Sequence, residues 1–146
     1  MPRTYTKILV QCVYSTKHRA KSIREPQRVW HLTREIARNL KIDIRAMGGT
    51  SDRPHFLFVL PADRRLSDVI RDLKANSSMI LRKERPTFRW QDGYAAISVS
   101  PGAVPAVIRY IEHQVEHHKK GASFEEEYME MLTRARIDYD PKYVLD

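Results

Sequence analysis

Two segments of this sequence are apolar on both faces of an extended chain, and they constrain the fold more than any other feature. They span residues 6–14 and residues 55–60. Both are rich in β-branched and aromatic residues, a composition typical of strands that are covered on both sides. We therefore expect each segment to form a central strand of a sheet.

The elements around these two strands predict an α+β fold. Residues 42–47 alternate as a half-buried strand does, and residues 94–100 form a short apolar strand. Helical spacing predicts an amphipathic helix over residues 26–41 and a second, basic helix that starts at Ser67 and Asp68. The order strand, helix, strand, strand, helix, strand is that of the ferredoxin-like split βαβ fold, with two helices on one face of an antiparallel sheet.

Two further helices are expected after the last strand. Ser100 and Pro101 form a helix start, and the helix should run to Lys119 and Lys120. A capping box at residues 123–126 opens a last helix to about residue 134. Residues 48–52 are expected to be a turn between two strands. No linker or repeat interrupts the series, so residues 1–146 are predicted to form one domain.

Charge indicates the class of partner. The 26 Lys and Arg residues outnumber 18 Asp and Glu residues, which gives a formal net charge of +8. A net positive charge of this size favours a polyanion as the binding partner. No apolar run approaches the roughly 20 residues of a membrane-spanning helix, and no leader is recognisable. We expect a cytoplasmic nucleic-acid binder with no membrane partner. The single cysteine, Cys12, lies in the first strand and is expected to pack in the core.

One stripe of polar residues is a candidate active site. Because side chains alternate along a strand, Arg53 and His55 should share the face that the two phenylalanines of their strand do not use. On the helix after residue 101, Gln114 and Tyr110 lie roughly 75° and 115° from the centre of the apolar stripe. This helix could therefore place Gln114 near His55, with Tyr110 at the rim.

The chemistry of such a site has two interpretations. A tyrosine beside a cation can attack phosphorus and form a covalent intermediate, which divides strand cleavage and rejoining into two transfers. A tyrosine at a helix edge can also be an ordinary surface aromatic. An RNA binder on a ferredoxin-like sheet is a further alternative, but the aromatic signature expected on its central strands is absent from this sequence.

Several short motifs, in one order and spacing, resemble a known family. They are Ser15-Thr16-Lys17, Gly48-Gly49 followed by Asp52 and His55, Trp90 to Tyr94, Ser98 to Ser100, and Tyr110-Ile111 with Gln114, His117 and His118. Together they resemble the single-tyrosine HUH transposases of small insertion sequences, including the relatives associated with repetitive extragenic palindromes (REPs).

The resemblance implies a prokaryotic DNA transposase. Such proteins cleave and rejoin single-stranded DNA next to imperfect hairpins, often as homodimers. It implies that Tyr110 is the nucleophile that forms a 5′-phosphotyrosine link, and that His55 and Gln114 help to hold a divalent metal, Mg²⁺ or Mn²⁺.

The first metal-binding histidine of the family is replaced here. Where the family has two histidines that flank one residue, this sequence has Arg53-Pro54-His55. Arginine stays protonated and has no free lone pair for a metal. Unless Asp52 or another oxygen substitutes, Mg²⁺ or Mn²⁺ would be weakly held. Either the Arg53 guanidinium binds the DNA phosphate directly, or the protein has lost the cleavage activity and kept DNA binding.

Phosphate contacts are expected from exposed basic side chains, each of which is otherwise an ordinary surface residue. The candidates are Lys17, Arg19, Arg53, Lys74, Arg82, Lys83, Lys119 and Lys120. Trp90 has two interpretations, a stacking platform for an unpaired base or a core residue. A structural role is expected for each of His113, His117 and His118, and at most one or two of them can join the site.

Overall fold

The computed structural model describes residues 3–114 and 123–142. Four strands and four α-helices make up this part of the chain, with a short 3-10 turn after β1 and another after β4. In chain order the elements are β1 (Leu9–Val13), η1 (Lys17–Arg19), α1 (Pro26–Asn39), β2 (Asp43–Thr50), β3 (Arg53–Val59), α2 (Leu66–Glu84), β4 (Ala95–Val99), η2 (Pro101–Ala103), α3 (Val104–Glu112) and α5 (Phe124–Arg134).

The sheet has the order β2-β3-β1-β4, and all neighbouring strands are antiparallel. The two segments that are apolar on both faces, β1 and β3, are the central strands, so the predicted ferredoxin-like order is confirmed. In their register Cys12 pairs with Phe56 and Val13 pairs with His55. None of the described helices is both long and apolar enough to cross a membrane.

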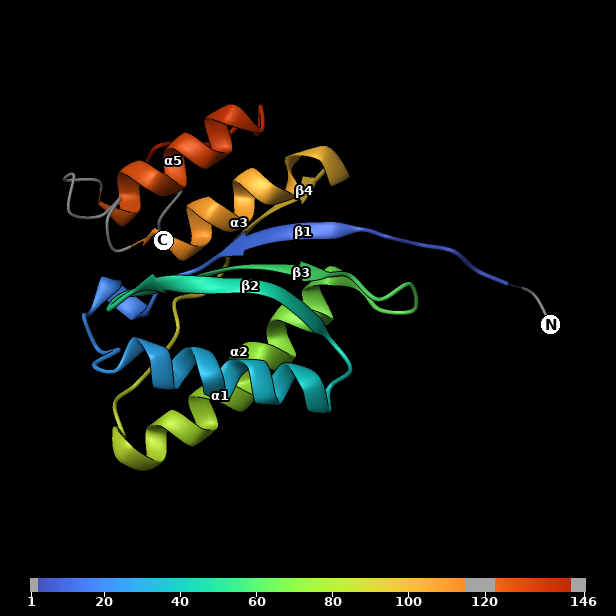
Figure 1. Ribbon diagram of the computed structural model, residues 1–146. Helices are drawn as coiled ribbons and strands as arrows, with labels where there is room; N and C mark the ends of the chain where they lie inside the picture. Colours follow the sequence, from blue (N-terminus) through green and yellow to red (C-terminus); the bar gives the residue numbers. More distant parts are fainter. Residues whose placement is uncertain (1–2, 115–122, 143–146) are drawn as a thin grey trace.

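Helices cover both faces of the sheet (Figure 1). Helices α1 and α2 enclose the larger core, which contains Cys12, Phe56 and Phe58, all fully buried. Cys12 is therefore a core residue, as predicted. On the opposite face α3 packs through Ile111 and α5 packs through Phe124. The tyrosine-bearing helix thus covers the face that the first two helices leave open.

The glycine pair does not form the predicted turn. Gly48 and Gly49 lie inside β2, and the chain reverses at Ser51 and Asp52. The reason is close packing. A Cβ atom on Gly48 would lie 3.2 Å from the carbonyl carbon of Ile111 and closer still to its oxygen. Glycine at this position therefore lets the end of α3 rest directly on the sheet.

Two helix boundaries also differ from the sequence prediction. The segment expected to be one helix from Pro101 begins with the 3-10 turn η2, and α3 ends at Glu112. Its predicted extension to Lys119 and Lys120 lies outside the described residues. Helix α2 begins at Leu66, one residue before the expected Ser67. At the start of α5 the predicted cap is present, because the hydroxyl of Ser123 accepts a hydrogen bond from the Glu126 amide at 3.2 Å.

Candidate active site

The three residues expected at the site lie together on the face that α3 covers. His55 in β3 and Gln114 just after α3 are buried, and Tyr110 in α3 is partly buried. The ring centroids of Tyr110 and His55 are 5.4 Å apart, edge to face. The side-chain amide of Gln114 donates to the backbone carbonyl of Tyr110 at 3.3 Å. One turn of helix therefore holds the phenol and the amide against the strand histidine.

A second amide, which the sequence reasoning missed, contacts the imidazole. Nε2 of Gln11 in β1 lies 2.8 Å from Nε2 of His55 in the adjacent strand β3. An amide N–H that donates here leaves the other ring nitrogen, Nδ1, to carry the proton. The signal in the sequence was one polar residue in the middle of an apolar strand.

Arg53 is enclosed in the protein instead of lying at its surface. It is 0 % exposed, and a charge removed from water must be paired. Its Nε lies 4.0 Å from the nearest carboxylate oxygens of both Asp52 and Glu127. Its guanidinium also lies over the Phe124 ring, 5.6 Å from the centroid. Two carboxylates and an aromatic ring therefore hold this cation within the fold.

Glu127 of α5 is the main residue that the sequence did not predict. Its side chain is 1 % exposed, and its Oε1 lies 3.3 Å from Nδ1 of His55. The sequence offered no signal, since Glu127 stands among three consecutive glutamates and only Glu126 was singled out, for capping. The carboxylate joins the imidazole and the guanidinium in one buried charged cluster.

The Tyr110 phenol is held in its protonated form. Burial raises the pKa of Tyr110 to about 12, and the Glu127 carboxylate adds to this rise. A hydrogen bond from Gln114 acts in the opposite direction and lowers the pKa of the phenol. A base is therefore needed before this oxygen can act as a nucleophile at neutral pH.

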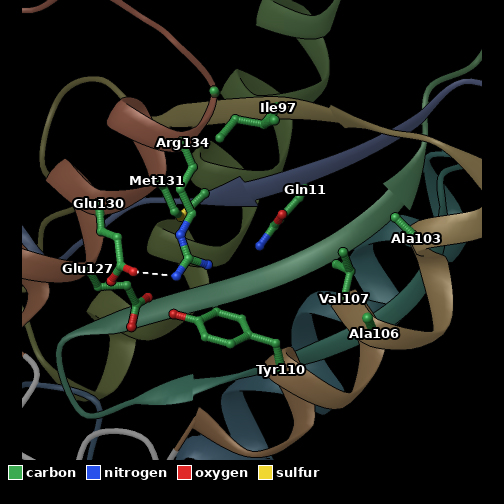
Figure 2. A pocket seen from close by; sticks show the side chains of 11 residues that line it. Gln11, Ile97, Ala103, Ala106, Val107, Tyr110, Glu127, Glu130, Met131 and Arg134 are labelled. Carbon is green, nitrogen blue, oxygen red and sulfur yellow. Dashed lines mark ion pairs between the residues drawn. The ribbon is translucent and has the colours of Figure 1, made fainter.

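The phenol faces a pocket of about 480 Å³ between the sheet, α3 and α5 (Figure 2). Its polar lining comes from residues of β1, α3 and α5, namely Gln11, Tyr110, Glu127, Glu130 and Arg134. Its apolar wall includes Ile97, Val107 and Met131. Tyr110 therefore lines a pocket whose opposite wall is formed by α5.

The residues present do not fit a divalent metal. Arg53 occupies the position of an expected ligand, and its charge opposes a second cation. Gln114 Oε1 is buried without a hydrogen-bond partner in the described part of the chain, which alone would suit a ligand. However, within residues 3–114 and 123–142 no group of three or more His, Cys, Asp or Glu side chains is placed to hold a metal. The Glu127 carboxylate beside His55 is already paired with the Arg53 guanidinium, and the remaining imidazole and amide are too few donors for Mg²⁺ or Mn²⁺.

The basic side chains expected to contact phosphate fall into different environments. Lys17 is exposed in η1, whereas Arg19 forms an ion pair with Glu125 of α5. Arg82 donates to the Ser78 carbonyl and hydroxyl at 3.2 and 3.1 Å, and Lys83 is exposed. Lys119 and Lys120, like His117 and His118, lie outside the described residues.

Lys74 has a structural role that the sequence did not indicate. Its ammonium donates to the carbonyls of Gln91 and Gly93 at 2.8 and 2.6 Å and lies over the Tyr14 ring. Burial lowers the pKa of Lys74. These contacts fix the connection between α2 and β4 to the core.

Trp90 and His113 also make local contacts. The indole of Trp90 donates to the Ser77 hydroxyl at 3.0 Å and packs against Tyr14 and Phe88, which favours the core interpretation. Nδ1 of His113 lies 2.7 Å from the Arg109 carbonyl oxygen at the end of α3. This contact agrees with a structural role.

A second pocket, of about 430 Å³, has a basic lining. It lies between the loop after β1 and the connection that follows α2. Its charged or titratable lining residues are Lys17, His18, Arg24, Arg85 and Arg89, and none of the described residues that line it is acidic. The Thr16 amide donates to the Asp52 carbonyl at 2.9 Å, so the loop borders the start of β3, where Arg53 lies.

Two solved structures share this fold. A candidate transposase from Deinococcus radiodurans R1 has a similar structure, with a TM-score of 0.62 and 21% identity over 78% of this chain and 96% of that one. A REP-associated tyrosine transposase bound to a REP hairpin also has a TM-score of 0.62, with 17% identity over 81% of this chain and 73% of that one. A comparison with curated proteins gives no significant match.

The family follows from the sequence. Residues 4–114 match the model of the IS200-like transposases, and this segment spans most of the chain. The protein therefore belongs to the IS200-like transposase family. The matched segment contains Tyr110, His55 and Gln114, and it ends before α5.

Proposed function

We propose that this protein cleaves and rejoins single-stranded DNA next to hairpins through a 5′-phosphotyrosine intermediate formed by Tyr110. One observation carries the proposal: Tyr110 lines a pocket with its phenol, its ring packs against His55, and its backbone carbonyl accepts a hydrogen bond from Gln114. A nucleophile on a helix that is packed against a rigid sheet has the fixed orientation that covalent catalysis needs.

The proposed reaction is a transesterification. The Tyr110 oxygen forms a bond to phosphorus while the bond from phosphorus to the 3′ oxygen breaks, leaving a free 3′-hydroxyl. A second 3′-hydroxyl reverses the step and rejoins the strand. The number of phosphoester bonds is unchanged, so the reaction needs no ATP.

Hairpin DNA is the proposed partner. The REP-associated transposase with the same fold is bound to a REP hairpin, and the net charge of +8 suits a polyanion. We assign the hairpin backbone to the basic pocket that Lys17, Arg24 and Arg89 help to line, because these side chains reach the surface next to the start of β3. We also propose a homodimer, which sedimentation analysis of the DNA-free protein would test.

The test is formation of a covalent adduct. The protein is incubated with end-labelled single-stranded DNA that carries hairpins, and denaturing gels detect the label transferred to protein. Tyr110→Phe should abolish the adduct. Tyr5→Phe, which changes a tyrosine that is 85 % exposed, should leave it unchanged. An adduct that survives in Tyr110→Phe would assign the nucleophile elsewhere.

A second candidate function is DNA binding without cleavage. The buried guanidinium of Arg53 at the position of an expected metal ligand favours it. This alternative predicts salt-sensitive hairpin binding that neither Tyr110→Phe nor a chelator alters, and no adduct from the natural protein. A gain of Mn²⁺-dependent cleavage in Arg53→His would then identify the replaced ligand as the cause of the loss.

A further inference from the structure

We propose that α5 completes the active site without a divalent metal: Arg134 binds the phosphate that Tyr110 attacks, and Glu127 accepts the phenol proton. This inference rests on the proposed strand transfer. It assigns catalytic roles to two residues beyond the segment that matches the family, since that segment ends at residue 114.

The reaction needs positive charge at the phosphate, and Arg53 is poorly placed to supply it. Negative charge grows on the phosphate oxygens as the phenol attacks, and a fixed cation stabilises it. Arg53 is 0 % exposed, and it lies near Asp52 and Glu127 and over the Phe124 ring. A phosphate in the pocket therefore cannot reach this guanidinium unless α5 moves.

Among the described residues that line the pocket, Arg134 is the cation. It lies in the last turn of α5 and lines the same pocket as Tyr110. Figure 2 shows its side chain extending into the space between Gln11, Glu127 and Tyr110. A guanidinium in this position can donate two parallel hydrogen bonds to phosphate oxygens.

The present partner of Arg134 is easily exchanged. Its guanidinium is 2.6 Å from Glu130, one turn earlier, and the two side chains are 78 % and 53 % exposed. An exposed ion pair of this kind contributes little to stability. A phosphate that enters the pocket can therefore replace Glu130 at low cost.

Glu127 is placed to take the proton. Figure 2 shows its carboxylate and the Tyr110 phenol pointing toward one another, and Oε1 of Glu127 lies 3.3 Å from Nδ1 of His55. Arg53 stands behind the carboxylate and balances its charge. Arg53, which opposes metal binding, thus balances the charge of the carboxylate that acts as the base.

Proton transfer accompanies the attack of Tyr110 on phosphorus. The phenol proton passes to the Glu127 carboxylate as the Tyr110 oxygen bonds to phosphorus. The bond from phosphorus to the 3′ oxygen breaks, and this oxygen takes its electron pair and a proton from water. The Arg134 guanidinium keeps its proton throughout and binds the two non-bridging oxygens. In the reverse transfer the attacking 3′-hydroxyl gives its proton to the hydroxide that the first step left in the solvent, and Glu127 returns its proton to the phenol.

The first test measures single-turnover adduct formation at saturating DNA with EDTA present. We expect the wild-type rate to be unaffected by EDTA and Arg134→Gln to slow it by about 10²-fold or more. Arg134→Lys should recover part of the rate. Arg136→Gln removes the same charge from an exposed position two residues away and should have no effect. Equal rates for Arg134→Gln and Arg136→Gln would overturn the role of Arg134.

The second test separates a proton acceptor from a structural carboxylate. Glu127→Gln should slow adduct formation by about 10²-fold to 10⁴-fold at pH 7, and its rate should rise about tenfold per pH unit as phenolate forms. Glu126→Gln, an exposed neighbour, serves as the control. Melting temperature and hairpin affinity verify that Glu127→Gln is folded. A variant with the wild-type rate and pH profile would overturn the proton transfer.

Two outcomes concern the site as a whole. An adduct that EDTA abolishes and Mn²⁺ restores would overturn the metal-free site, while the proposed strand transfer would stand. A wild-type protein that forms no adduct under any condition would overturn the strand transfer and this inference with it.

Discussion

Replacing Gly48 by alanine should separate α3 from the sheet and displace Tyr110. The new Cβ would lie well inside 3.0 Å of the Ile111 carbonyl oxygen, a distance that real Cβ atoms essentially never show. The obstacle is backbone, so α3 must retreat by on the order of 1 Å. Overpacking of this kind costs about 1–3 kcal/mol, and a misplacement of about 1 Å can slow a reaction by about 10²-fold.

Urea unfolding and the adduct assay measure the two effects. The control is Gly102→Ala in η2, where a Cβ would meet nothing within 4 Å. This variant should equal the wild type or gain about 0.4–1 kcal/mol from a stiffer unfolded chain. If Gly48→Ala unfolds at the same urea concentration as Gly102→Ala, the close approach of α3 to β2 is incorrect. A normal adduct rate with reduced stability would show that Tyr110 does not depend on this contact.

Single substitutions at Arg53, Tyr110 and Arg89 should have distinct effects on stability, DNA affinity and metal binding. Arg53→Ala leaves Glu127 as a buried charge without its guanidinium, and urea unfolding should show a loss of about 3–5 kcal/mol; Arg45→Ala, at an exposed ion pair, should cost less than about 1 kcal/mol. The pKa of Tyr110 is about 12 in the folded protein, whereas the phenol of the unfolded chain has a pKa near 10. The contribution of the buried phenol to the free energy of unfolding is therefore complete below pH 10 and is lost as pH rises toward 12. Thermal melts should therefore show Tyr110→Phe losing less stability than the wild type between pH 9 and 11. Arg89→Gln should reduce the salt dependence of hairpin affinity by about one phosphate contact, measured by fluorescence anisotropy, and Arg45→Gln should not. Arg53→His should bind Mn²⁺ more tightly than the wild type does in electron paramagnetic resonance titrations, and equal binding would contradict the exclusion of metal by Arg53.

Local sequence patterns predicted the sheet because the apolar content of each strand reflects how far that strand is buried. Only β1 and β3 are apolar on both faces, and only central strands need to be. The alternation in β3 also placed His55 on the face opposite Phe56. Tyr110 and Gln114 followed from helical periodicity, since residues four apart share one side of a helix. The candidate nucleophile and its two neighbours were therefore within reach of the sequence.

Contacts between distant segments could not be predicted in the same way. The sequence around Gly48 predicts a turn because glycine marks both turns and close approaches, and only the position of α3 distinguishes the two. Lys74 has the sequence context of a surface lysine until the carbonyls of Gln91 and Gly93 are placed around it. Glu127 depends on how α5 lies against the sheet, which no local pattern specifies.

The positions of Arg53 and Glu127 indicate that the two residues depend on each other. A buried guanidinium without a carboxylate, or the reverse, leaves a charge in a medium of low dielectric constant. Arg53 lies within the segment that matches the family and Glu127 lies beyond it, so the pair joins the shared fold to the C-terminal helix of this chain. Histidine at residue 53 would remove the permanent charge that Glu127 balances. The double variant Arg53→His with Glu127→Gln should therefore bind Mn²⁺ less tightly than Arg53→His does, because the unpaired carboxylate of the single variant attracts the divalent cation.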